Sequence, residues 1–349
     1  MKDSTSNFDA EKFVDNLINN GARVNCDNTN DKYNEYKLPA DFDEEKFKRG
    51  QKFYHDNIFM LFMGKLTGLV TILSIPSILK ILVFTNMSAT TYTSYRRYMA
   101  TIFHMNVWYT DDFKPGSDLW KSMADVRRKH NTASKRSACV GANRISQLDM
   151  AITQFGFMGY ALTHPEKIGL FHPDPVGLEG FVYLWRIIGD LMGIEDQFNI
   201  CRHSAEDTRA VCQLIIEKQL RKYAEQRDPL FVKMASTLVE GMQVMQPFLC
   251  PGLTLVVILR LVSPGSQLLK EEMAKLNKDQ LWSYNFEQLV INSCRHWFWR
   301  WYLNMTLHVS LWLMKYFPFL ALWKYGRKDG YVRILEEPAP SLRNVYQSG

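Results

Sequence analysis

The sequence lacks the paired cysteines that most structural metal sites and disulfide frameworks need. Its six cysteines are widely scattered and none belongs to a C-x-x-C pair, which is poor material for zinc and weak for a set of disulfides. We therefore expect reduced thiols and an intracellular setting. The N-terminal stretch MKDSTSNFDAEKF also lacks the continuous apolar core of a signal peptide.

The common catalytic motifs are missing as well. No histidine has Glu or Asp three residues before it, so the Glu-x-x-His pairs of di-iron carboxylate bundles are excluded. The sequence has no P-loop, no G-x-G-x-x-G, no H-E-x-x-H and no G-x-S-x-G. A hydrolase, a kinase or a nicotinamide-dependent enzyme is therefore not expected.

A strong excess of one charge and a long hydrophobic run are also absent. The 42 basic and 36 acidic residues give a net charge of +6, which we interpret as too small and too evenly spread for nucleic-acid binding. The apolar stretches between Lys65 and Lys80 and between Arg300 and Lys315 hold 14 uncharged residues each. A spanning helix needs about 20, so we expect both stretches in a protein core.

Helical periodicity, by contrast, runs through almost the whole chain. Ser204 is a predicted N-cap, and Val211, Leu214 and Leu220 follow it at roughly helical spacing. Short Pro/Gly breaks separate such stretches, and alternating strand patterns are scarce. We predict an all-α fold with a polar, partly disordered lead-in over 1–38, one large helical domain over 39–333, and a polar tail over 334–349.

The C-terminal segment 296–326 is predicted as one aromatic helix that ends near Lys324 and Arg327. A dense aromatic band with closing basic residues is typical of a helix that lies in a bilayer interface. An aromatic helix packed on the domain has the same composition. The periodicity does not separate the two interpretations.

Polar residues share one face of the helix predicted within the stretch YTSYRRYMATIFHMNVWY. Arg97, Thr101 and His104 follow at spacings of four and three, which aligns them on one inward stripe. A buried arginine is costly unless it is paired, so Arg97 needs a carboxylate or a bound anionic group. His104 is either a distal partner at such a site or a core residue, and we favour the core.

The next predicted helix carries a second inward histidine. Ser117 is its expected N-cap, and the helix is predicted to run to about Asn131. Met123 and His130 fall on its inward face, whereas the two cations directly before His130 point elsewhere.

Isolated inward histidines beside cations are the material from which a haem pocket is built. A haem needs one axial nitrogen, an apolar sleeve and cations for its propionates. His130 offers the nitrogen, and Arg97, Arg127, Arg128 or Lys129 offer the cations. The competing interpretation is a core histidine that closes one hydrogen bond, which is the commoner fate of such a residue.

Five stretches together resemble a known family. They are DFDEEKFKRGQKFY, YRRYMATIFH, DVRRKHN, ISQLDMAITQFGF and LWRIIGDLMGI. In order and spacing they are similar to the ER-bound oxygenase and rubber oxygenase (latex-clearing protein) catalytic domain family, over about 38–200. This resemblance implies an all-α, globin-like core with additional flanking helices.

The resemblance also implies roles for particular residues. The histidine of the VR..H stretch, His130, corresponds to the proximal ligand of the haem b iron, and Arg97 and Thr101 correspond to distal residues. Ala100 stands where some latex-clearing proteins have an iron-capping lysine, and the family's catalytic glutamate has no clear counterpart. Gln147 and Asp149 are expected to orient loops or to fix the His130 ring through a hydrogen bond, and the competing interpretation is helix capping.

The function expected from these residues and this resemblance is that of a haem-dependent oxygenase. Its substrates would be dioxygen and the C=C bond of an isoprenoid or another lipid-like molecule, with Arg97 and Thr101 as catalytic residues and Arg127 beside the haem. The alternative is a non-catalytic, membrane-associated helical protein that binds a lipid or isoprenoid and has lost the haem. We expect an intracellular protein, associated with the ER membrane through the C-terminal segment or cytoplasmic.

Overall fold

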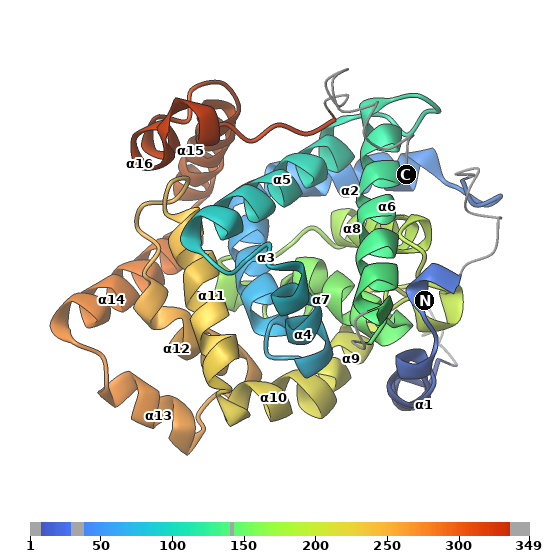
Figure 1. The fold of residues 1–349 in the computed structure, drawn as a ribbon, viewed down its shortest axis with the longest axis horizontal. Helices are drawn as coiled ribbons and strands as arrows, with labels where there is room; N and C mark the ends of the chain where they lie inside the picture. The colour runs from blue at the N-terminus through green and yellow to red at the C-terminus, as the bar shows by residue number, and fades with distance from the viewer. Residues whose placement is uncertain (1–7, 29–37, 140–142, 336–349) are drawn as a thin grey trace.

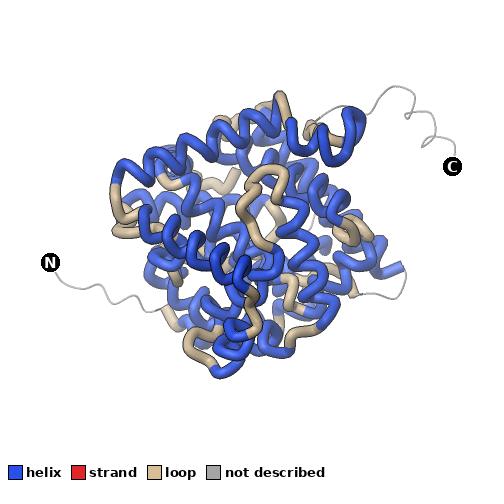
Figure 2. Tube along the Cα trace, turned by 90° about the vertical axis from the view of Figure 1, so that its left-hand side faces the viewer, coloured by secondary structure: helices blue, strands red, loops and turns tan. Residues whose placement is uncertain are grey.

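The computed structural model describes residues 8–28, 38–139 and 143–335, and these ranges are all-α, as predicted (Figures 1 and 2). Extended pairing within them is limited to an isolated bridge between Asn25 and Ser146. The helices are α1 (Ala10–Asn19), α2 (Glu44–Asp56), α3 (Ile58–Ile72), α4 (Pro76–Thr85), α5 (Thr91–Thr110), α6 (Asp118–Cys139), α7 (Gln147–Thr163), α8 (Pro175–Leu191), α9 (Ala205–Ile215), α10 (Arg221–Gln226), α11 (Pro229–Met242), α12 (Thr254–Val262), α13 (Gln267–Ala274), α14 (Lys278–Ser293), α15 (Trp297–Tyr316) and α16 (Phe319–Asp329).

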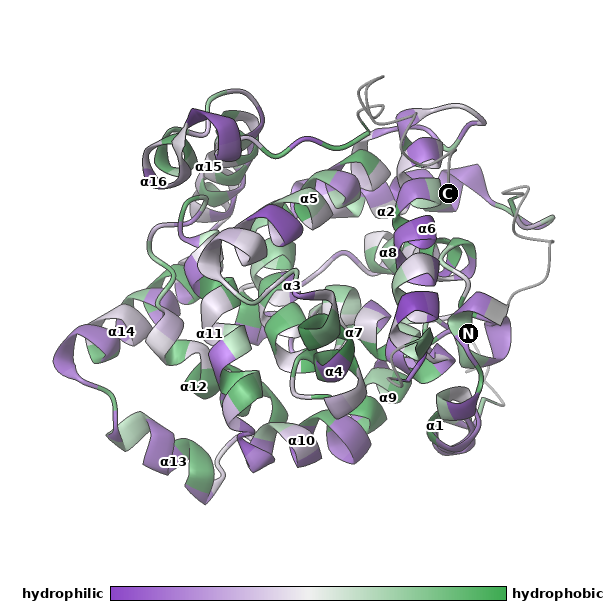
Figure 3. Ribbon diagram, viewed as in Figure 1, coloured by the Kyte–Doolittle hydropathy of each residue, from purple (hydrophilic) through white to green (hydrophobic). Residues whose placement is uncertain are grey.

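Helix α3 lies at the centre of the molecule (Figure 1). It contacts α2, α7, α11, α12 and α15, and all of its residues except Thr67 are buried. A helix that is apolar on every side is stable only when other helices surround it. Figure 3 shows the contrast between the hydrophobic colour of α4 near the centre and the more hydrophilic α6 at the side. The hydrophobic core extends from Val14 to Val332 as one connected cluster.

Two glycine pairs let helices approach at backbone distance. A Cβ atom on Gly68 of α3 would lie 2.0 Å from the carbonyl oxygen of Gly156 on α7. Similarly, a Cβ atom on Gly50 of α2 would lie 2.3 Å from the carbonyl oxygen of Gly180 on α8. The α2–α8 and α3–α7 contacts are therefore set by the absence of side chains, because any larger residue would force the helices apart.

A side chain from the far end of the chain caps the central helix. Asn57 precedes α3 but makes no side-chain capping bond. Instead the Oδ1 atom of Asn304 on α15 accepts a hydrogen bond from the Phe59 amide at 3.0 Å. The Nδ2 atom of Asn304 also donates to the carbonyl of Asp56 at 2.8 Å. One amide thus satisfies both the end of α2 and the start of α3.

The lead-in predicted for 1–38 includes ordered structure between Ala10 and Asn28. The Asp9 side chain accepts a hydrogen bond from the Lys12 amide and caps α1. Val14 and Leu17 are fully buried, and α1 contacts α9. Two apolar residues one turn apart thus anchor a mainly polar segment. The rest of the predicted lead-in, 1–7 and most of 29–38, and most of the predicted tail lie outside the described residues.

The predicted end of the helix after Ser117 was wrong. Helix α6 begins after Ser117, whose Oγ accepts from the Trp120 amide at 3.1 Å, but it continues to Cys139 rather than ending near Asn131. No proline or glycine follows His130 until Gly141, so no residue there stops a helix.

The single helix predicted over 296–326 is broken in two. Phe317 leaves helical geometry with φ −143° and ψ 66°, because the residue before a proline is pushed out of the α region. Pro318 then precedes α16. The predicted N-caps at Ser117 and Ser204 are confirmed by their hydrogen bonds to amides three residues later.

The glycine contact of α3 with α7 predicts a sharp difference between two neighbouring substitutions. In Gly68→Ala the new methyl group meets the backbone of α7, which cannot rotate away, and overpacking of this kind costs about 1–3 kcal/mol. In Gly64→Ala it meets the tip of the Ile168 side chain at 2.8 Å, which can turn aside. Both changes gain about 1 kcal/mol of helix propensity. Urea unfolding should show Gly68→Ala clearly less stable than Gly64→Ala, and equal midpoints would contradict the close contact.

Candidate functional site

The predicted site residues belong to α5 and α6, which contact each other, and α6 also contacts α4. His130 projects from α6, and Arg97 and Thr101 project from α5. Burial, and then the positive charges of Arg97 and Lys129, lower the pKa of His130 to about 4. The imidazole is therefore neutral at pH 7 and keeps a lone pair on one ring nitrogen.

The His130 ring combines deep burial with some accessible surface. Its Nδ1 atom is buried and has no hydrogen-bond partner, yet the residue as a whole is only half-buried. Part of the residue therefore reaches solvent, while its Nδ1 atom does not. A buried ring nitrogen without a protein partner is unfavourable unless a ligand or a water completes it.

Arg97 and Thr101 share the inward stripe of α5 as predicted, and both are half-buried. The Nη1 atom of Arg97 lies 3.5 Å from the Thr85 hydroxyl of α4, which is a long and weak hydrogen bond. Thr101 donates its hydroxyl proton to the Arg97 carbonyl at 3.0 Å. Thus Arg97 brings a cation to the vicinity of His130, while the Thr101 oxygen keeps its lone pairs for another donor.

The predicted cations of the DVRRKHN stretch have partners away from the Arg97–Thr101 stripe of α5. Arg127 is buried, and its Nη1 donates to the Leu191 carbonyl at the end of α8 at 3.0 Å. Arg128 and Lys129 both pair with Asp125, at 2.5 and 2.6 Å. Burial would raise the pKa of Asp125, but these two contacts hold it below its usual value. Of the four cations predicted to bind haem propionates, Arg97 is the one that lies on the same face of α5 as Thr101.

His104 takes part in a hydrogen-bond network in the core through Nδ1, whereas its buried Nε2 atom has no hydrogen-bond partner. Trp108 donates its indole N–H to the Ser122 hydroxyl at 2.8 Å, and the same hydroxyl lies 2.8 Å from Nδ1 of His104. The indole can only donate, so the serine proton is left for Nδ1, and the neutral ring carries its own proton on Nε2. That nitrogen faces Asp125 at 3.6 Å. Burial and then Lys129 lower the pKa of His104 to about 4.

The Gln147 and Asp149 side chains have partners other than the His130 ring. The Ser146 and Asp149 side chains form a capping box at the start of α7, and Asp149 also accepts from Ser77 at 2.5 Å. The Gln147 side chain donates to the Gly193 carbonyl at 2.9 Å and accepts from the Glu195 amide at 3.0 Å. Asp149 therefore caps a helix, whereas Gln147 orients the loop that follows α8.

The sequence analysis missed a buried lysine on the central helix. Lys65 is 3% exposed and its Nζ atom has no hydrogen-bond partner. The contact described for this amine is a cation–π contact with the Phe62 ring, whose centroid lies 5.4 Å away. Burial lowers the pKa of Lys65 to about 7. The signal was available, because Lys65 is the single charged residue between Asn57 and Lys80.

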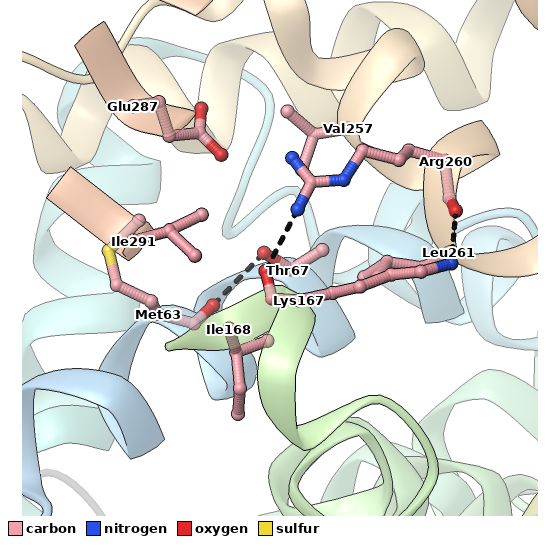
Figure 4. Close-up of a pocket in the computed structure, with 9 residues that line it drawn as sticks. All are labelled: Met63, Thr67, Lys167, Ile168, Val257, Arg260, Leu261, Glu287 and Ile291. Atoms are coloured by element: carbon pink, nitrogen blue, oxygen red, sulfur yellow. Dashed lines mark hydrogen bonds between the residues drawn. The ribbon is translucent and has the colours of Figure 1, made fainter. Parts of the chain in front are cut away.

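A small pocket lies elsewhere, between α3, α12, α14 and the 3-10 turn Pro165–Ile168 (Figure 4). It encloses about 280 Å³, with the solvent at its mouth included. Lys167 and Arg260 border it, and each donates to the other's backbone carbonyl at 3.0 Å. Burial raises the pKa of Glu287 on the opposite wall, with Arg260 opposing the shift. None of the predicted site residues lines this pocket.

The unpaired amine of Lys65 predicts that its removal stabilises the fold. Replacement of buried charged groups by apolar residues of similar volume gains about 1–4 kcal/mol in favourable cases. Lys65→Met should therefore raise the free energy of unfolding at pH 7. The unfolded lysine stays protonated up to its ordinary pKa of 10.5, so the stability of the wild type rises between pH 7 and 10.5 and the difference should shrink there. Lys80→Met, at an exposed position on α4, is the control and should change little.

The lowered pKa of His130 predicts a loss of stability in acid. Above pH 6.5 the ring is neutral in both states, so the contribution is fully present there. As the pH falls from 6.5 to about 4, the unfolded chain binds a proton that the folded chain excludes, and stability falls by about 1.4 kcal/mol per pH unit. Urea unfolding of His130→Phe should show a shallower pH dependence in this window than the wild type. Parallel curves would contradict the assigned environment.

The described residues offer no metal site built from several protein ligands. Within 8–28, 38–139 and 143–335, no three His, Cys, Asp or Glu side chains gather to hold an ion, and all six cysteines are free thiols. A haem iron needs only one protein nitrogen, so this finding does not bear on His130.

No family model, curated protein or solved structure matches the chain. The family resemblance and the globin-like core therefore stay predictions.

Proposed function

We propose that the protein is a haem-dependent oxygenase that uses dioxygen on the C=C bond of an isoprenoid or another lipid-like substrate. The observation that carries this proposal is His130, a neutral, inward imidazole with accessible surface and a buried Nδ1 atom that no described group satisfies. Its position on α6 beside Arg97 of α5 agrees with the roles that the family resemblance implies.

The residues fit a haem in two respects. A neutral imidazole can donate a lone pair to iron without first losing a proton, and the low pKa of His130 keeps it neutral across the physiological range. Arg97 supplies a cation for a propionate or another anionic group, and none of the described salt bridges occupies it. When bound, haem b would supply the iron at which dioxygen is activated.

The chain's own residues would then orient the reactants. Arg97 would hold negative charge near the His130 stripe, and Thr101 would accept a hydrogen bond, because its proton is already used on the Arg97 carbonyl.

One observation favours the second function, a non-catalytic protein that binds a lipid or isoprenoid without haem. A metal-bound histidine almost always donates its other ring N–H to a carboxylate or a carbonyl. The two residues considered for that bond have other partners, Gln147 in the loop after α8 and Asp149 at the start of α7. Ala100 in place of a lysine and the missing glutamate counterpart point the same way.

A haem spectrum of the purified full-length chain separates the two functions. The oxygenase proposal expects a Soret band and about one iron per chain. In His130→Gly the band should be lost and should return when free imidazole is added, because the added ring occupies the space of the missing one. Far-ultraviolet circular dichroism shows whether the variant still folds.

His104→Gly is the matched control, since it removes the other buried histidine of the same helix pair. It should keep the haem and lose stability, because its partner is Ser122. A colourless wild type with full helicity would support the lipid-binding function. Loss of haem in the His104 variant alone would overturn the assignment of His130.

A further inference from the structure

Helices α15 and α16 carry apolar side chains that nothing in the described structure covers. We define the aromatic face by Trp301, Met305, Val309, Trp312 and Tyr316 on α15 and Trp323 on α16. Their exposures run from 45% to 87%. The α15 members follow at spacings of four, four, three and four residues, so they form one stripe along the helix. Figure 1 places both helices at one corner of the molecule, away from α1 and α6.

The opposite side of α15 is fixed to the protein. Leu307, Leu311 and Met314 are buried, and the Asn304 amide holds the junction of α2 and α3. Helix α15 is thus apolar on two sides, with one side in the core and the other toward solvent. This corrects the expectation that the whole stretch between Arg300 and Lys315 lies in a protein core. A contiguous exposed apolar surface of this kind marks a site of interaction with a protein or a membrane.

The charges beside the aromatic face decide between these partners. Residues 288–328 contain six of the 42 basic residues and none of the 36 acidic ones, so the remainder of the chain holds equal numbers of each. The net charge of +6 is therefore concentrated here, which corrects the even spread assumed from the sequence. Arg295, Lys315, Lys324, Arg327 and Lys328 are exposed. A second copy of the same face would bring like charges together, whereas anionic lipid headgroups would complement them.

The geometry favours a helix in the plane of the interface over a spanning one. Segment Trp297–Asp329 is long and apolar enough to cross a membrane by composition. However, the 14 uncharged residues between Arg300 and Lys315 extend about 21 Å as a helix, short of the hydrocarbon thickness of about 30 Å. The break at Phe317 interrupts the helix, and Asn304 ties its inner side to the protein.

We propose that the aromatic face docks the protein on a membrane surface that contains anionic lipids. Tryptophan and tyrosine rings would lie at the level of the headgroups, and the neighbouring lysines and arginines would contact lipid phosphates and carboxylates. This proposal does not depend on haem, because it concerns the corner of the molecule formed by α15 and α16.

Sedimentation of the full-length chain with sucrose-loaded vesicles tests the proposal. We expect strong binding to vesicles of phosphatidylcholine with phosphatidylserine, weak binding to phosphatidylcholine alone, and weaker binding at high salt. The triple variant Lys315→Gln, Arg327→Gln, Lys328→Gln should lose about a hundredfold in affinity, because each cation near an anionic surface contributes about fivefold. The variant Trp312→Ser, Trp323→Ser should lose affinity for both vesicle types.

Two control variants change the same properties elsewhere. Lys121→Gln, Lys135→Gln, Arg136→Gln removes three exposed cations from α6, and Val176→Ser, Met87→Ser removes two exposed apolar side chains. Both should bind vesicles as the wild type does. Equal losses in the control and test variants, or no vesicle binding by the wild type, would overturn the proposal.

Two further outcomes would also overturn it. Retention in the membrane pellet after alkaline carbonate extraction would indicate a spanning helix. Self-association that disappears in Trp312→Ser, Trp323→Ser, without any vesicle binding, would assign the face to a second copy of the chain.

Discussion

The structure depends on how closely α7 approaches α3. At Gly68 and Gly156 the two helices meet with no side chain between them, and the same device joins α2 to α8 at Gly50 and Gly180. Such contacts bring backbone atoms of the two helices within range of dispersion attraction. They also leave the crossing angle of the helices little room to change. The elements that surround α3 are placed by this contact, including α12 beside the small pocket and α15 at the outer corner.

Lys65 and His130 each have a buried nitrogen without a hydrogen-bond partner among the described residues, but their surroundings differ. The Lys65 amine lies against the Phe62 ring on the central helix, where its burial works against the stability of the fold. His130 keeps some accessible surface, and the proposal of a bound group depends on this difference. Folded proteins tend to keep such unfavourable groups where function requires them. The Nε2 atom of His104 is also buried and unpartnered, but this residue is 3% exposed and its Nδ1 atom contacts the Ser122 hydroxyl.

Much of the fold followed from the sequence, and the failures have identifiable physical causes. Helical periodicity and the caps at Ser117 and Ser204 were local signals, and they predicted local structure correctly. The end of α6 was missed because no breaker follows His130 before Gly141. Helix α1 was missed because only two buried residues, Val14 and Leu17, anchor it, through contacts with a distant helix. For the site, helical spacing placed Arg97, Thr101 and His130 inward, but it could not foresee that Asp125 engages Arg128 and Lys129 or that Arg127 reaches the end of α8.

The amide of Asn304 has a consequence for the order in which the molecule is completed during synthesis. It accepts from Phe59, 245 residues earlier in the chain, so the first turn of the innermost helix lacks its acceptor until α15 has been synthesised. Loop closure over such a separation is slow relative to local helix formation. The structural centre therefore gains this contact later than the hydrogen bonds within its own helices.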